Sequence, residues 1–234
     1  MTSTVHSLTK GLLGLIYPVR CGGCGSNGNI LCRQCTNTFR FVEETSSCPI
    51  CGRLVGHRIV CGQCLDKKKP FEEGFYGFYY EKRLRDAIHS FKFSGRKDVG
   101  KCLVHLVRTK MDTFSGRFDC IVPVPVTEKR LRERGFNQSF IIAEEISGIT
   151  GKPVCHGVLQ KTKETKDQYA LSKDERKRNI KGAFSLKRVD TIRGKRVLLI
   201  DDLYTTGQTA REASRTLAKG KTKAVLFFAL ARTP

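Results

Sequence analysis

The stretch from Val197 to Thr209, VLLIDDLYTTGQT, constrains the fold of this chain more than any other. Four apolar residues in a row predict a short strand buried on both faces, as in a parallel sheet. Two carboxylates, Asp201 and Asp202, follow at the expected end of that strand, and a hydroxyl-rich loop with one glycine comes next. Apolar residues then recur at helical spacing, so the loop should join a strand to the N-terminus of a helix.

A loop in that position predicts a phosphate site, because backbone N–H groups converge at a helix N-terminus and the helix dipole favours negative charge. The hydroxyls of Thr205, Thr206 and Thr209 add hydrogen-bond donors, and Gly207 lets the backbone approach a ligand closely. The two aspartates would repel a phosphate, but they suit sugar hydroxyls next to it. A ribose 5-phosphate therefore fits the whole stretch.

This stretch resembles the phosphoribosyl diphosphate (PRPP) motif of type I phosphoribosyltransferases: an apolar strand, two acidic residues, then Thr-Thr-Gly-x-Thr. The resemblance implies that PRPP binds here with Mg²⁺, and that the two aspartates are the catalytic candidates. The alternative is an ordinary strand-to-helix turn whose Thr and Asp side chains only cap the helix. A Walker loop is excluded, because no Gly-Lys-Ser/Thr follows a glycine-rich run. The predicted PRPP-binding residues are Asp201, Asp202, Leu203, Tyr204, Thr205, Thr206, Gly207, Gln208 and Thr209.

Eight of the eleven cysteines form four successive Cys-x-x-Cys pairs near the N-terminus. This spacing places two thiolates on one metal, and four pairs in a row do not fit a redox motif, which occurs singly. The ferredoxin spacings of an iron–sulfur protein are absent. We therefore expect two structural Zn²⁺ ions, each held by four cysteines. The expected ligands are Cys21, Cys24, Cys32, Cys35, Cys48, Cys51, Cys61 and Cys64.

The order in which these pairs combine is open between sequential and cross-braced sites. Shorter gaps within each set of four favour sequential sites, and the longer gap between the sets resembles a linker. His57 lies between Cys51 and Cys61 and could replace a ligand, but an exposed loop residue is the favoured interpretation. Cys102, Cys120 and Cys155 are isolated in apolar surroundings and are expected in the core.

The chain carries 43 basic and 22 acidic residues, a formal net charge of +21. An excess of this size, spread over every part of the chain, indicates a polyanionic partner such as nucleic acid or an anionic membrane surface. The alternative is a basic protein whose charge only keeps it in solution. Candidate nucleic-acid contacts are Lys67, Lys68, Lys69, Lys92, Arg96 and Lys97.

No run approaches the roughly 20 apolar residues that a membrane span requires, and no export signal is convincing. The cytoplasm is the default location, with a peripheral position at the inner face of the membrane as a second option. Stable disulfides are not expected there.

Strands alternating with helices predict an α/β fold: a mostly parallel sheet with helices on both faces, preceded by a small zinc-binding module. The expected divisions are a short N-terminal helix (1–17), a double zinc-finger module (18–66) and a phosphoribosyltransferase-like domain (67–234). A second strand, 119–124, should lead into a basic loop containing Arg134, which would face the pyrophosphate of PRPP if the two loops are neighbours. A third strand is expected at 154–160.

Residues 161–179 are nearly all polar, which is typical of a mobile functional loop or lid. Gln168 and Arg176 lie in it and are further pyrophosphate or lid candidates.

Several motifs occur in the order seen in the ComF/GntX family, which the chain therefore resembles from Tyr17 to Arg232. They are the four Cys-x-x-Cys pairs, Phe-Lys-Phe-Ser-Gly (91–95), Val-Pro-Val-Pro (122–125), Arg-Gly-Phe-Asn-Gln (134–138), the 168–179 loop and Asp-Asp-Leu-Tyr-Thr-Thr-Gly (201–207). The resemblance implies a phosphoribosyltransferase-like domain behind zinc fingers, and a role in handling incoming single-stranded DNA in natural transformation or DNA uptake. Other DNA-uptake proteins, such as a helicase, are implied as further partners.

Two main functions follow from these residues, and a regulator that senses PRPP but has lost catalysis is a third possibility. The first is a nucleic-acid-handling protein that binds PRPP or a related phosphoribosyl compound. The second is a metabolic phosphoribosyltransferase acting on a base or an amine. No single residue stands out in the sequence as a general base, so enzymatic activity is not deducible from it.

Overall fold

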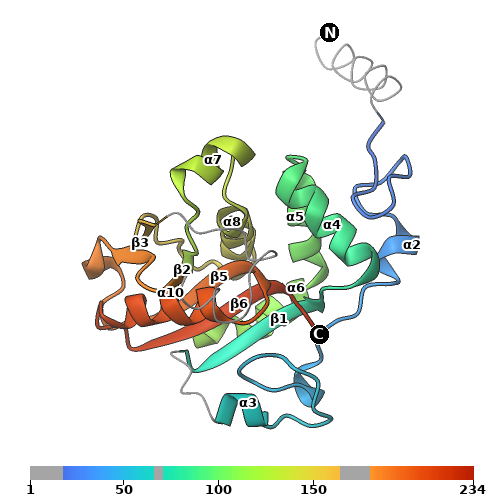
Figure 1. Ribbon diagram of the computed structural model, residues 1–234. Coiled ribbons are helices and arrows are strands. Elements are labelled where there is room, and N and C mark those ends of the chain that lie inside the picture. Colours follow the sequence, from blue (N-terminus) through green and yellow to red (C-terminus); the bar gives the residue numbers. More distant parts are fainter. Residues whose placement is uncertain (1–17, 66–70, 164–179) are drawn as a thin grey trace.

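The computed structural model describes residues 18–65, 71–163 and 180–234 (Figure 1). The expected N-terminal helix, the three linker lysines Lys67, Lys68 and Lys69, and the loop residues Gln168 and Arg176 lie outside these ranges. The helices are α2 (Arg33–Thr36), α3 (Gly62–Leu65), α4 (Lys82–Phe93), α5 (Lys97–Leu106), α6 (Arg108–Phe114), α7 (Glu128–Arg134), α8 (Gln138–Thr150) and α10 (Gln208–Ala218), with 3₁₀ turns η1 (Glu44–Ser46), η2 (Ser115–Arg117) and η4 (Val189–Thr191).

Four parallel strands form the central sheet, in the order β1-β6-β5-β2. Their bounds are β1 (Glu73–Tyr79), β2 (Cys120–Pro123), β5 (Arg196–Tyr204) and β6 (Ala224–Arg232). All nine residues of β6 are buried, as are the four apolar residues that begin the motif strand. This is the continuous apolar pattern expected of a parallel sheet covered on both faces.

Helices cover both faces of the sheet, so the predicted fold class is confirmed (Figure 1). Along β5, Leu198 and Ile200 belong to one buried cluster, with α4, α5, α6 and α8. Val197 and Leu199 belong to the other, with α10 and a two-stranded antiparallel sheet of β3 (Leu159–Lys161) and β4 (Phe184–Leu186). The alternation of strand side chains thus divides the core into two layers.

The segment between the two cysteine sets was expected to be a linker, but it lines the edge of the sheet. Phe41 bridges Phe78 of β1 in antiparallel orientation, and the Val42 N–H donates a hydrogen bond to the Gly77 carbonyl. Phe39 and Phe41 both pack on the Phe78 ring. An uncovered edge strand exposes unpaired backbone groups, so this segment protects β1.

Two other sequence predictions were wrong in detail. The basic loop after β2 contains helix α7, because Thr127 caps its first turn and Gly135, at φ 74°, ends it in the left-handed conformation that glycine tolerates. The strand expected at 154–160 is interrupted by Gly157, at φ 67°, so that Val154 forms a single bridge with Ile121 and β3 begins only at Leu159.

Within the described ranges, the helices are all too short or too polar to cross a lipid bilayer.

Candidate functional site

The threonine loop, residues 205–207, joins β5 to α10 as the sequence predicted, although β5 is longer than expected. The strand continues through both aspartates to Tyr204, because β6 pairs with it as far as Arg232. Gly207 then caps α10 with a left-handed φ of 73°. A Cβ atom at Gly207 would lie 2.3 Å from the Tyr204 hydroxyl, so the loop requires glycine there for both conformation and space.

Asp202 forms a buried ion pair with Lys92, whose Nζ lies 2.9 Å from its Oδ2. Both residues are 9% exposed. Lys92 stands at the end of α4, and it is one of the candidate nucleic-acid contacts. The ion pair buries the charge of this candidate beside the aspartates.

Asp201 has a different environment from its neighbour. Its Oδ1 accepts hydrogen bonds from the Ser139 hydroxyl at 3.3 Å and from the Asp202 N–H at 2.9 Å. Burial and the Asp202 charge raise the pKa of Asp201 to about 7, although Lys92 acts in the opposite direction. The carboxyl can therefore exchange a proton near neutral pH.

The start of α8 meets the aspartates because β2 pairs directly with β5. Gln138 is 1% exposed and donates from Nε2 to the Lys92 carbonyl at 3.3 Å, and Arg134 donates to its Oε1 at 3.3 Å. The Arg134 guanidinium also lies 5.0 Å from the centre of the Phe93 ring. The two strand–loop–helix connections are thus neighbours, which was the condition for Arg134 to face the ligand.

Sequence reasoning missed Ser139, Gln138 and the role of Lys92 in this site. Gln138 and Lys92 do stand in two of the family-like motifs, Arg-Gly-Phe-Asn-Gln and Phe-Lys-Phe-Ser-Gly. No sequence pattern predicted that these two residues meet at the end of β5.

Two other nucleic-acid candidates lie within the described residues: Arg96 is paired with a carboxylate, whereas Lys97 lies near an aromatic ring. Arg96 donates from Nε and Nη2 to the Asp98 carboxylate, with the shortest contact at 2.7 Å, and this raises the pKa of Arg96. Lys97 is exposed, and its Nζ lies 5.2 Å from the centre of the Phe136 ring. Lys97 is therefore the more accessible of the two cations.

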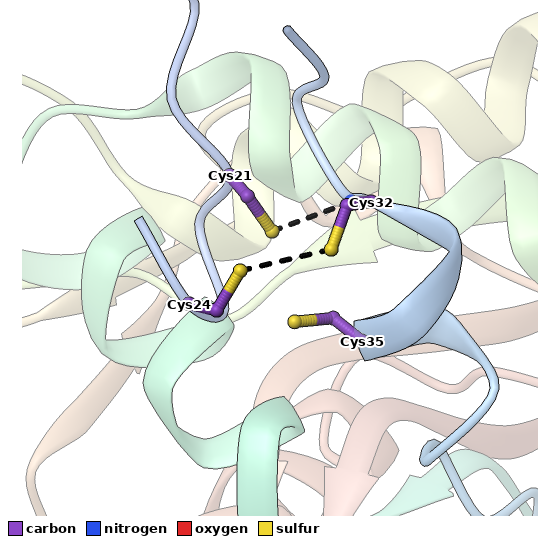
Figure 2. A group of neighbouring side chains, drawn as sticks. All are labelled: Cys21, Cys24, Cys32 and Cys35. Carbon is purple, nitrogen blue, oxygen red and sulfur yellow. Dashed lines mark hydrogen bonds between the residues drawn. The ribbon is translucent and has the colours of Figure 1, made fainter. Parts of the chain in front are cut away.

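The eight cysteines of the Cys-x-x-Cys pairs form two groups of four, in sequential order. We call Cys21, Cys24, Cys32 and Cys35 the first cluster, and Cys48, Cys51, Cys61 and Cys64 the second cluster. Within each cluster the four sulfur atoms lie within 4.8 Å of one another, and Figure 2 shows the first cluster's sulfurs pointing toward a common centre. Four convergent thiols fit a tetrahedral structural zinc ion.

Backbone groups support the cysteine ligands. The Cys32 N–H donates to the Cys21 sulfur at 3.3 Å, and the Cys61 N–H donates to the Cys48 sulfur at 3.4 Å. Such hydrogen bonds to sulfur orient a thiolate for its metal. His57 is exposed and belongs to neither cluster, as expected.

The other three cysteines are only partly as predicted. Cys120 is fully buried, but Cys102 and Cys155 are only half-buried.

A zinc module joined to a parallel α/β domain is the class of protein that these features define. In agreement, residues 12–65 match the double zinc ribbon domain family. The chain is 31% identical over 209 residues to DNA utilization protein YhgH of Escherichia coli (strain K12), a match covering 87% of this chain and 90% of that protein. It is 30% identical over 230 residues to competence protein F of Haemophilus influenzae, covering 92% and 98%. Competence protein ComFC of Bacillus subtilis is 27% identical over 211 residues, covering 87% and 84%.

The chain therefore belongs to the family of these DNA utilization and competence proteins, the ComF/GntX family that its motifs resemble. Among solved structures, it is similar to adenine phosphoribosyltransferase of Leishmania donovani, with a TM-score of 0.40, 13% identity, and coverage of 86% of this chain and 78% of that one. Glutamine PRPP amidotransferase of Bacillus subtilis gives a TM-score of 0.34 and 23% identity, covering 59% and 26%.

Proposed function

We propose that this protein binds PRPP with Mg²⁺ at the threonine loop and handles incoming single-stranded DNA during DNA uptake. The observation that carries the PRPP part is the order of groups at the end of β5. Two carboxylates lie near the end of β5, and the threonine loop then leads to a glycine-capped helix N-terminus. This order would separate acceptors for ribose hydroxyls from donors for the 5-phosphate. Arg134 would approach the pyrophosphate, and Mg²⁺ would offset its charge.

The DNA part is supported by the relatives and by charge. The similar proteins are named for DNA utilization and for competence. The net charge of +21 would attract a phosphate backbone. The aspartate pair is an unsuitable surface for that backbone, so DNA and PRPP would occupy different places.

A second candidate function is enzymatic transfer of phosphoribose to a base or an amine. It is favoured by one observation, the raised pKa of Asp201, since a carboxyl that titrates near 7 can act in proton transfer. Measuring pyrophosphate release from PRPP, with and without single-stranded DNA, distinguishes the two functions. Release that requires only PRPP and a small acceptor would favour the metabolic enzyme.

Calorimetry with PRPP and Mg²⁺ tests the site. Asp201→Asn should weaken binding roughly tenfold or more, since a charge-assisted hydrogen bond contributes about 1.5–3 kcal/mol. Asp190→Asn is the control, because its side chain is 92% exposed. Equal PRPP affinity in both variants would show that the ligand binds elsewhere.

Fluorescence anisotropy with a labelled oligonucleotide tests DNA binding. Each phosphate contact should contribute about 0.7 to the slope of log affinity against log salt concentration. Changing Lys67, Lys68 and Lys69 together to Ala should reduce both affinity and slope. The control variant changes Lys187, Lys219 and Lys223, which are exposed, to Ala. It therefore removes the same amount of positive charge. If the oligonucleotide does not bind at low salt, or if its binding does not depend on salt, the net positive charge only keeps the protein in solution.

A further inference from the structure

The two cysteine clusters are attached to different layers of the α/β domain. Cys21 and Cys35 of the first cluster belong to the buried group that contains α4, α5, α6 and α8. All four cysteines of the second cluster belong to the other buried group, together with Tyr204 and with apolar residues of α10. The second cluster therefore shares its core with the residue that precedes the threonine loop and with the helix that follows it.

The zinc knuckle, residues 47–52, carries the first two cysteines of the second cluster and packs against β1. The hydroxyl of Tyr76 on β1 donates a hydrogen bond to the Ile50 carbonyl at 2.7 Å. A Cβ atom at Gly52 would lie 2.4 Å from the Tyr76 ring, so the knuckle backbone rests directly on that ring. Because the Ile50 carbonyl lies between two metal ligands, zinc binding fixes the acceptor of the Tyr76 hydroxyl.

The same ring contacts the residue that precedes the threonine loop. The centres of the Tyr76 and Tyr204 rings lie 5.1 Å apart in an edge-to-face arrangement, and Phe227 packs against both rings. All three side chains are buried. The Tyr204 hydroxyl in turn fills the space beside Gly207, where a Cβ atom would lie 2.3 Å from it. In a close-packed core, the Tyr204 ring has little room to move without displacing the loop.

We propose that Tyr76 is a positioning residue, which couples zinc binding at the second cluster to the shape of the threonine loop. This inference rests on the proposed function, because the threonine loop is the candidate PRPP site. With zinc bound, the knuckle is held in place and the Tyr76 hydroxyl keeps its acceptor, so the two tyrosine rings support the loop. Since coupling between two binding sites is reciprocal, PRPP should in turn strengthen zinc binding at the second cluster.

Tyr79 offers a matched control. It is also a buried tyrosine of β1, and its hydroxyl contacts the same zinc knuckle, at 3.4 Å from the Ser47 hydroxyl and at 3.4 Å from the Gly52 carbonyl. Tyr79→Phe therefore removes a comparable contact with the knuckle and leaves the ring of Tyr76 in place. Tyr76→Phe keeps its ring against Tyr204 and removes only the hydrogen bond to the knuckle.

The first measurement is hydrogen–deuterium exchange of the full chain without ligand, at full zinc occupancy in every variant. In Tyr76→Phe, peptides that cover the threonine loop should exchange roughly two- to tenfold faster than in the wild type, as expected for the loss of one hydrogen bond. In Tyr79→Phe they should exchange at the wild-type rate. Equal exchange in the two variants would overturn the proposal.

The second measurement is the zinc affinity of each cluster, from competition with a chelating dye, with and without PRPP and Mg²⁺. Cys24→Ser and Cys51→Ser assign the two steps to the first and second clusters. In the wild type, PRPP should raise the zinc affinity of the second cluster roughly two- to tenfold and leave that of the first unchanged. This effect should disappear in Tyr76→Phe and persist in Tyr79→Phe. A role of Tyr76 in stability alone would not make zinc affinity depend on PRPP.

The two measurements fail for different reasons. If PRPP binds in calorimetry but leaves the second cluster's zinc affinity unchanged, or changes both clusters equally, the coupling is refuted while the PRPP site stands. If calorimetry detects no PRPP binding, the proposed function fails, and the exchange measurement without ligand still decides whether Tyr76 positions the loop.

Discussion

The ammonium of Lys92 and the carboxylate of Asp202 form a buried ion pair at 2.9 Å, which connects the end of α4 to the end of β5. Without a neighbouring cation, two adjacent aspartates would repel a phosphorylated ligand. Lys92 neutralises one of them, and the raised pKa of Asp201 reduces the charge of the other. The carboxylates can therefore serve as hydrogen-bonding groups for sugar hydroxyls at a modest electrostatic cost.

Replacing Lys92 should destabilise the protein, because it leaves the Asp202 carboxylate buried without a counter-ion. Lys92→Met should lower the free energy of unfolding by about 3 kcal/mol, as expected for removal of one partner from a buried pair. Urea denaturation measures this. Lys97→Met, a few residues further along and exposed, should change stability by less than about 0.5 kcal/mol. Similar losses in both variants would mean that the ion pair is not a stabilising contact.

The titration of Asp201 predicts how stability depends on pH. The folded-state pKa is about 7, whereas an unfolded aspartate titrates near about 3.9. Between these two pKa values, the folded state holds a proton on Asp201 that the unfolded chain has released. The stabilisation that this gives is complete below the unfolded-state pKa and is lost as pH rises through about 7. As pH rises between these two values, the free energy of unfolding of the wild type should fall relative to that of Asp201→Asn. Denaturation curves at several pH values measure this, with Asp190→Asn expected to follow wild type. Parallel curves for Asp201→Asn and wild type would contradict it.

Gly207→Ala should distort the threonine loop. The change forces alanine into a left-handed conformation, at a cost of roughly 1–2 kcal/mol, and also brings its Cβ against the Tyr204 hydroxyl. Gly151→Ala is a matched control, because Gly151 has a φ of 68° with open space around it. Thermal unfolding should show the larger loss for Gly207→Ala, and only that variant should weaken PRPP in calorimetry. Equal losses would mean that the tyrosine moves aside freely.

The two clusters should release zinc at different rates. In the first cluster Cys24 is exposed and Cys32 half-buried, whereas all four cysteines of the second cluster are buried. A chelating dye should detect two zinc ions per chain, released in a faster and a slower phase. Cys24→Ser should remove the faster phase and Cys51→Ser the slower one. A single phase, or iron in place of zinc, would contradict the assignment.

The sequence by itself determined the features that depend on neighbours along the chain. The Cys-x-x-Cys spacing and the short gaps within each set were enough to pair the clusters correctly, because nearby thiols converge without help from the rest of the fold. The apolar run before Asp201 and the glycine before α10 likewise predicted the strand–loop–helix unit. Periodicity also predicted the parallel sheet with helices on both faces.

Only the tertiary structure decided which distant residues meet. The strand order pairs β1 with β6, from opposite ends of the domain, and no local pattern encodes that choice. The same packing covers β1 with Phe41, brings Ser139 to Asp201, and buries Lys92, which looked like an ordinary surface lysine. Hydrophobic periodicity fixes the faces of an element, but the contacts of a side chain depend on how whole elements pack, and that depends on the core as a whole.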